Sequence, residues 1–243
     1  MFPTLADQIL ARPDLADQLL EGLERAGRFA ATRAMACTVA ASDVMDAPTS
    51  EARRLDQLLF GELFRVLDEQ GGWVWGQAAR DGQVGWIRLS DLTADVSRPT
   101  HRVAAASATV GGRILSLNAL VVSDGAAGLA DLLTFAADCA EAAESLLGAP
   151  YAQGGRTRDG VDGWGLVRQA LFAAGKGAPV VQQDGSLLMG RRLAGAEAPG
   201  RGDIVLSEGG PGVVTGPDEM IRSRQGQGVA REPLPEEALY FRP

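Results

Sequence analysis

Residues 148–171, GAPYAQGGRTRDGVDGWGLVRQAL, join the end of one predicted helix to the start of another and decide the fold of the second half of the chain. The segment before it, residues 129–147, has helical spacing of its apolar residues. Gly148 followed by Pro150 is the usual order of residues that end a helix. The sequence therefore predicts one continuous helix over 129–147.

A second helix is predicted over residues 162–174. Asp162 is of the residue type that caps a helix N-terminus by accepting backbone N–H groups. The apolar face of this helix is formed by Leu166, Val167, Ala170 and Leu171. After Gly202 the short runs DIVL, GVV, EMIRS and VARE alternate as strands do. The second half is therefore predicted to be helices packed on an antiparallel sheet.

The first half divides into three segments by its pattern of apolar residues. Residues 1–34 have helical spacing and are predicted as an N-terminal helical segment, in which Pro13 separates two short helices. Residues 35–97 carry short apolar runs between turn signals, which is typical of a small β-barrel. Residues 98–128 predict a second, shortened β unit that packs against a neighbour, with a Gly-Gly turn at 111–112.

Composition and charge exclude several classes of function. The chain has 243 residues, a net charge of -8 and no basic block, so nucleic acid and membrane surfaces are not expected as partners. There is no leader sequence and no apolar run of membrane-spanning length, so we expect a cytoplasmic protein, with leaderless export left open. One histidine and two cysteines exclude a zinc-finger type of metal site, and no metal or cofactor is predicted.

Five short motifs in the second half occur in an order that resembles a known family. They are Gly148-Ala149-Pro150-Tyr151, Gln153-Gly154-Gly155, Asp162-Gly163-Trp164-Gly165-Leu166, Gly202-Asp203-Ile204-Val205 and Pro211-Gly212-Val213-Val214. Over residues 138–240 this order and spacing resemble the NlpC/p60 family of cell-wall cysteine peptidases. The resemblance implies an α+β fold with a papain-like domain over residues 129–243.

The first half shows a second resemblance. Its motifs are Gln57-Leu58-Leu59-Phe60-Gly61-Glu62, Gly72-Trp73, Asp81-Gly82-Gln83-Val84-Gly85-Trp86 and Pro99-Thr100-His101-Arg102-Val103. The first three resemble a bacterial SH3-like domain, and the last resembles the start of another. The layout is similar to murein-recycling dipeptidyl peptidases, and it implies SH3-like β-barrel domains before the papain-like domain.

The catalytic positions implied by the resemblance hold residues that cannot catalyse. A cysteine peptidase needs a thiolate, an imidazole and a polar group that orients the imidazole. The family pattern places the nucleophile at Gly163, the base at Gly210 or Pro211, and the orienting group at Arg222. Glycine has no side chain, and an arginine cannot accept a hydrogen bond. We therefore expect no peptidase activity of the family type and predict no catalytic residue.

Neighbouring family positions have also changed. Trp164 stands where the family has a serine, Gln153 replaces a tryptophan, and Val181-Gln182 replace an Asp-Ser pair that lines the substrate pocket. The ligand cleft that could remain is formed by Tyr151, Asp162, Gly163, Trp164 and Arg222.

Two interpretations of that cleft stay open. In one, the helix N-terminus at Gly163 binds an anion such as a peptide carboxylate, with Arg222, Arg156 and Arg158 around it. In the other, Trp164 is largely buried and fills the former groove, with Arg222 at its edge.

Other reactive or aromatic side chains are expected to be structural. Cys37 and Cys139 are predicted to be buried, the latter in the middle of its helix. His101 is expected on the surface or between units, at an edge of the second β unit. The barrel tryptophans Trp73, Trp75 and Trp86 are expected to support its fold, with a peptide groove as the alternative.

The leading functional hypothesis is a catalytically inactive NlpC/p60 homologue. By resemblance it binds peptidoglycan-derived peptides or a protein partner. The alternatives are an active hydrolase that acts on murein peptides through unidentified residues, and a purely structural subunit such as a partner of an active paralogue. The oligomeric state is left open, and a homo-oligomer is one of the options.

Overall fold

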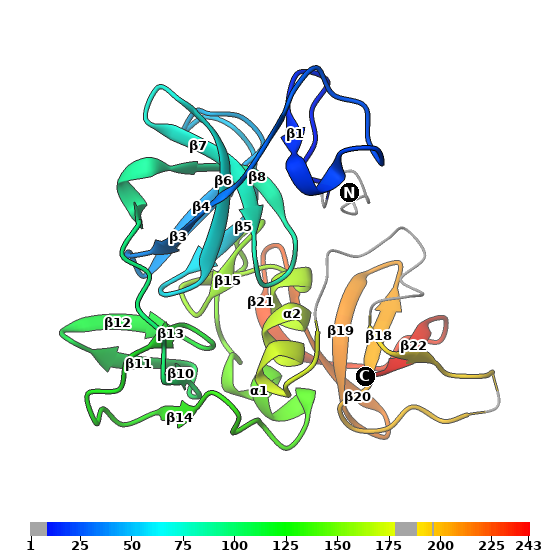
Figure 1. Ribbon diagram of the computed structural model, residues 1–243. Helices are drawn as coiled ribbons and strands as arrows, with labels where there is room; N and C mark the ends of the chain where they lie inside the picture. Colours follow the sequence, from blue (N-terminus) through cyan, green and yellow to red (C-terminus); the bar gives the residue numbers. More distant parts are fainter. Residues whose placement is uncertain (1–8, 178–188, 196) are drawn as a thin grey trace.

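The computed structural model describes residues 9–177, 189–195 and 197–243. The protein is mostly β, with two short α-helices at its centre (Figure 1). A seven-stranded sheet and a smaller β unit lie on one side of the helices, and a six-stranded sheet lies on the other. None of the helices in the described residues is long and apolar enough to cross a membrane.

The seven-stranded sheet is antiparallel, in the order β5-β4-β8-β7-β6-β3-β9. Its strands are β3 (Arg33–Cys37), β4 (Ala41–Met45), β5 (Arg54–Leu59), β6 (Leu63–Gln70), β7 (Trp73–Ala78), β8 (Val84–Arg88) and β9 (Leu92–Thr93), with a 3-10 turn at Leu89–Asp91. The predicted strands and the turns at Gly71-Gly72 and Asp81-Gly82 are confirmed. The hydrogen-bonded order has β5 and β9 at its two edges, so the sheet does not close into the predicted barrel.

The expected N-terminal helices are absent from the described residues before β3. This segment is an arm with β1 (Ala16–Asp17), a 3-10 turn (Gln18–Leu20) and β2 (Phe29–Ala30). Its backbone groups pair within the arm, and Leu10 packs on the tryptophans of β7 and β8. Leu19 and Leu23, which suggested a helical face, are 74% and 78% exposed. Tertiary packing of the arm has therefore overridden its helical pattern.

The smaller β unit is formed by five short strands of the described residues, β10 to β14. Its strands are β10 (His101–Val103), β11 (Ser107–Val110), β12 (Arg113–Ser116), β13 (Leu120–Val121) and β14 (Leu129–Asp131). Gly111 and Gly112 make the β11–β12 turn with positive φ angles, which glycine adopts without strain. The unit packs on the seven-stranded sheet, since Leu59 shares a buried cluster with Val103, Leu115 and Val121.

The single helix predicted over 129–147 is wrong. Leu129–Asp131 form strand β14 beside β10, and the helix starts only at α1 (Cys139–Ser145). The side chain of Asp138 accepts the N–H of Glu141 and so caps this helix at its N-terminus. The unit 98–128 therefore extends to residue 131, and Cys139 is the first residue of its helix rather than a middle one.

Helix α2 (Gly163–Ala173) and the strands after Gly202 agree with the prediction. The six-stranded antiparallel sheet has the order β17-β22-β18-β19-β20-β21. Its strands are β17 (Arg191–Arg192), β18 (Ile204–Ser207), β19 (Gly210–Gly216), β20 (Glu219–Arg224), β21 (Gly228–Pro233) and β22 (Leu239–Arg242). Helices α1 and α2 share one buried apolar cluster with this sheet. A short hairpin, β15 (Arg156–Thr157) and β16 (Gly160–Val161), precedes α2.

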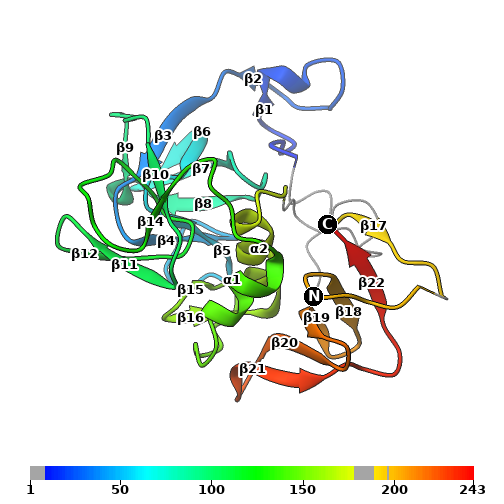
Figure 2. The ribbon, with the colours of Figure 1, turned by 90° about the horizontal axis from the view of Figure 1, so that it is seen from below.

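Helix α2 lies between the three β parts, as both views show (Figure 2). The smaller β unit holds it through Asn118, which donates to the carbonyl of Gln169, and through Arg102, which donates to the carbonyl of Ala173. The seven-stranded sheet holds it through an ion pair between Asp56 and Arg168. The position of α2, and of the site at its N-terminus, therefore depends on all three parts.

Candidate functional site

The N-terminus of α2 is built as the sequence predicted. Oδ1 of Asp162 accepts the N–H of Gly165 at 2.7 Å and caps the helix. Oδ2 of the same carboxylate accepts the N–H of Gly154 at 2.7 Å, which ties the preceding loop to the helix. Position 165 requires a glycine, because a Cβ atom there would collide with the carbonyl oxygen of Gly155. The backbone of Gly154-Gly155 thus packs directly on the first turn of α2.

Pro211 is the residue that faces the nucleophile position. A Cβ atom placed on Gly163 would lie 3.2 Å from both Cγ and Cδ of Pro211. A Cβ atom on Gly210 would meet nothing within 4 Å. Of Gly210 and Pro211, Pro211 is therefore the residue that lies against Gly163, and its ring can neither donate nor accept a proton.

Arg222 lies on β20 beside this pair. Its Cβ is 3.2 Å from the place where a Cβ of Gly212 would stand, next to Pro211 in the chain. Its guanidinium group forms an ion pair with Glu232 at 2.5 Å and donates to Oγ of Ser207 at 3.4 Å. Arg222 shares this carboxylate with Arg224, whose guanidinium group lies 2.6 Å from the same oxygen of Glu232.

Tyr151 and Trp164 are the other two residues of the predicted cleft. Tyr151 is half-buried, and burial together with the negative charge of Asp162 raises the pKa of its hydroxyl. Trp164 is partly buried and packs against the apolar cluster shared by α1 and α2. Val181 and Gln182, expected at the pocket, lie outside the described residues.

Arg156, expected beside an anion at Gly163, does not lie there. Arg156 points away into a buried cluster with Asp56, Glu62 and Asp81, and its side chain has no exposed surface. Arg158 is exposed at the turn between β15 and β16. Of the three arginines, Arg156 is therefore not available to an anion at the helix N-terminus.

The two cysteines are buried, as expected. Burial raises the pKa of both thiols to about 12, so neither is a thiolate at neutral pH. The ring nitrogens of His101 contact Thr100 at 2.9 Å and Asp131 at 3.3 Å. His101 lies on β10, the central strand of its small sheet and not an edge. These contacts give no Cys-His pair.

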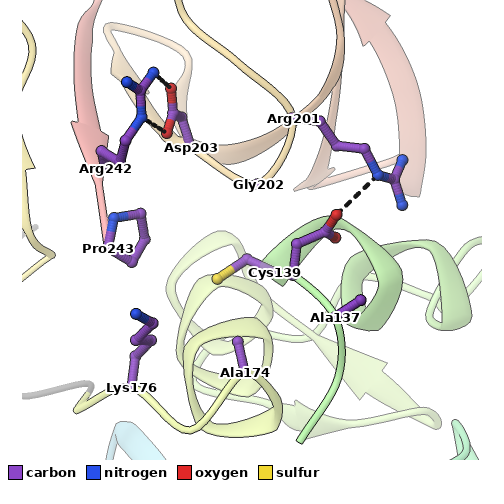
Figure 3. Close-up of a pocket in the computed structure, with 10 residues that line it drawn as sticks. Ala137, Cys139, Ala174, Lys176, Arg201, Gly202, Asp203, Arg242 and Pro243 are labelled. Carbon is purple, nitrogen blue, oxygen red and sulfur yellow. Dashed lines mark hydrogen bonds and ion pairs between the residues drawn. The ribbon is translucent and has the colours of Figure 1, made fainter.

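A cavity of about 220 Å³ lies at the opposite, C-terminal end of α2 (Figure 3). The thiol of Cys139 and the amine of Lys176, the one lysine of the chain, lie at its sides. Its two arginines are already engaged, Arg201 by Asp138 and Arg242 by Asp203. Among the described residues, no group of three or more His, Cys, Asp or Glu side chains could hold a metal ion.

The tryptophans of the seven-stranded sheet pack against the N-terminal arm. Trp73, Trp75 and Trp86 are buried with Leu10 in one cluster, and the guanidinium carbon of Arg12 lies 4.3 Å from the centre of the Trp75 ring. The expectation that these tryptophans support the fold is confirmed. The arm covers Trp75 through Arg12, whereas Trp73 lies under Arg88 and lines a cavity of about 390 Å³ on the same sheet, so the alternative of a peptide groove stays a prediction.

Comparisons with known proteins agree with this architecture. Residues 44–92 match the family model of the bacterial dipeptidyl-peptidase SH3 domain. An NlpC/P60 family protein from Bacillus cereus ATCC 10987 superposes with a TM-score of 0.72 at 18% identity, covering 86% of this chain and 99% of its own.

Two further solved structures show a weaker similarity to this chain. NlpC2 and NlpC1 from Trichomonas vaginalis each give a TM-score of 0.48, at 14% and 17% identity. They cover 88% and 95% of this chain, and 99% of their own chains. No curated protein matches the chain. The chain therefore shares the fold of a bacterial NlpC/P60 family protein and carries, at residues 44–92, a segment that matches the SH3 domain of bacterial dipeptidyl-peptidases.

Proposed function

We propose that residues 132–243 are a papain-like NlpC/p60 domain without catalytic groups, and that the protein binds peptidoglycan-derived peptides or a protein that handles them. The observation that supports this most directly is the contact between Gly163 and Pro211. The positions implied for nucleophile and base are adjacent, as a catalytic pair must be, but neither residue has a group that transfers a proton or attacks a carbonyl.

The rest of the site supports the same proposal. Arg222, at the position that the family pattern implies for the orienting group, is paired with Glu232, which it shares with Arg224. Neither thiol of the chain is available as a substitute nucleophile, because burial keeps both protonated. The half-buried Tyr151 and Trp164 belong to the predicted cleft and offer aromatic surface to a ligand. The cytoplasmic location expected from the sequence is part of this proposal, and cell fractionation tests it.

The first experiment measures hydrolysis. The purified protein is incubated with an L-Ala-γ-D-Glu-diamino acid peptide, and products are followed by mass spectrometry. We expect no turnover above the rate of a buffer blank. Turnover that persists in a Cys37→Ser, Cys139→Ser double variant would reveal an unrecognised hydrolase, and turnover lost in it would reveal a cysteine enzyme.

The second experiment measures binding of the same peptide by calorimetry. A Gly163→Val variant places a branched side chain against Pro211 and should abolish binding. Gly177→Val is the matched control, because a Cβ at Gly177 meets nothing within 4 Å, and it should bind as the unaltered protein does. If the unaltered protein binds no such peptide, the peptide part of the proposal is wrong, and only binding of a protein partner is left.

A further inference from the structure

Five charged side chains are sealed between the seven-stranded sheet and the helical part of the protein, and we call them the interdomain ion cluster. They are Asp56, Glu62, Asp81, Arg156 and Arg168. The three acidic residues belong to the seven-stranded sheet and its turns. The two arginines belong to the β15–β16 hairpin and to α2. The side chains are at most 6% exposed.

Two of the carboxyl groups share the same pair of guanidinium nitrogens. Nη1 of Arg168 lies 2.7 Å from Oδ2 of Asp56 and 3.6 Å from Oδ2 of Asp81. Nη1 of Arg156 lies 3.5 Å and 3.2 Å from the same two oxygens. Two carboxyl groups that share one desolvated site do not both ionise easily, so one of them retains its proton to a higher pH.

Asp56 is the carboxyl group that holds this proton. Its Oδ1 atom is buried and has no hydrogen-bond partner among the described residues. In a dry site an ionised carboxylate oxygen without a partner costs much more free energy than the oxygen of a neutral carboxyl group. The third acid, Glu62, has its own cations, because Arg156 and the partly exposed Arg80 lie 2.9 Å and 2.8 Å from its Oε1.

We propose that the interdomain ion cluster is a proton-linked latch: docking of α2 on the seven-stranded sheet takes up one proton at Asp56, and loss of that proton weakens the docking. Because Arg156 precedes Asp162 by six residues on the same hairpin, the latch also sets how firmly the Gly163 end of α2 is held. The latch does not depend on the proposed function.

The direction of the pH effect follows from the linked titration. Burial raises the pKa of Asp56 to about 7, against the opposing charges of Arg168 and Arg156. Burial also disfavours the charge of Asp81, but Arg156 and Arg168 outweigh it and lower that pKa. The folded protein thus binds a proton at Asp56 that the unfolded chain has released above about pH 4. Stability from this proton is present at acidic pH and is lost as the pH rises through about 7.

Urea unfolding of the full chain between about pH 6 and pH 8 tests the latch, because ordinary carboxyl groups are ionised there in both states. We expect the urea midpoint to fall across this range in the unaltered protein. In Asp56→Asn, which cannot release a proton, most of that fall should disappear. Asp43→Asn is the matched control, because Asp43 forms an exposed ion pair with Arg54 in the same sheet, and it should keep the fall.

If Asp56→Asn does not fold, infrared spectroscopy of the unaltered protein tests the latch by detecting the protonated carboxyl group directly. The unaltered protein should show a protonated carboxyl band at pH 6 that is lost by pH 8, since buried acids alone retain a proton there. In Asp81→Asn the neighbouring negative charge is gone, so the band should disappear at a lower pH. The absence of such a band in the unaltered protein, or an equal fall of the midpoint in a folded Asp56→Asn variant, would overturn the latch.

Discussion

At the level of single residues, the ring of Pro211 lies where a side chain at position 163 would stand. The 3.2 Å separation between the Pro211 ring and a Cβ on Gly163 is tighter than most Cβ contacts in proteins. A side chain at 163 therefore fits only if Pro211 moves by a few tenths of an ångström. The residue at position 163 and the ring of Pro211 are thus sterically coupled.

This coupling gives a prediction for Gly163→Cys. The new thiol would stand on the first turn of an eleven-residue helix, where the free N–H groups lower a thiol pKa. We expect alkylation by iodoacetamide to proceed at a lower pH than for a free cysteine, with no hydrolysis of the murein peptide because no base is present.

The control for this variant is the unaltered protein, whose two buried thiols should not react under the same conditions. Peptide hydrolysis by Gly163→Cys would show that an unidentified base lies near Pro211 and would contradict the proposed loss of catalysis.

At the level of elements, the start of α2 depends on one carboxylate that serves two segments. Replacing Asp162 by Ala removes the acceptor for both Gly165 and Gly154. Loss of an N-cap costs about 1–2 kcal/mol, and the second bond adds to it. We expect urea unfolding to show at least this loss of unfolding free energy.

The conservative variant Asp162→Asn separates the two bonds. Its single amide oxygen can accept the N–H of Gly165 or of Gly154 but cannot replace both carboxylate oxygens. An intermediate loss is therefore expected, and equal stability of Asp162→Asn and Asp162→Ala would contradict the account of two bonds.

Elements with a local signal were predictable from sequence, and elements set by distant contacts were not. Helix α2 has its own N-cap and apolar face, so its start was predicted within one residue. The segments 14–27 and 129–138 have equally good helical spacing. One is folded into an arm over the tryptophans and the other supplies an edge strand beside β10. Their periodicity was overridden by packing that no local pattern encodes.

In the candidate site, too, features with a local sequence signal were predictable and features set by distant contacts were not. The positions of Gly163, Pro211 and Arg222 follow from motif order, and the structure brings them together. The error about Arg156 has a different origin, since its partners Asp56 and Glu62 lie about a hundred positions away. Nothing around residue 156 distinguishes a buried arginine from an exposed one such as Arg158.

At the level of the whole molecule, the interdomain ion cluster makes one cooperative unit from parts that resemble separate domains. Removal of one member of a buried ion network leaves its partners uncompensated and typically costs about 3–5 kcal/mol. We expect this loss in Arg156→Met, measured as the free energy of unfolding in urea, and we expect a single transition in the unaltered protein.

Arg158→Met is the matched control for this prediction. Arg158 lies on the same hairpin but is exposed, so the change should cost less than about 0.5 kcal/mol. Two separate transitions in the unaltered protein would show that the seven-stranded sheet and the helical part unfold independently, and would contradict a cooperative unit.

The acidic residues and the arginines of the interdomain ion cluster are far apart in the sequence, so they emerge from the ribosome at different times. Asp56, Glu62 and Asp81 leave the ribosome about 75 to 112 residues before the arginines that neutralise them. The nascent seven-stranded sheet therefore cannot bury these carboxyl groups until Arg156 and Arg168 have emerged. Its final packing is a late step, completed from the C-terminal side, and a ribosome stalled before residue 156 would hold a sheet with an open, acidic face.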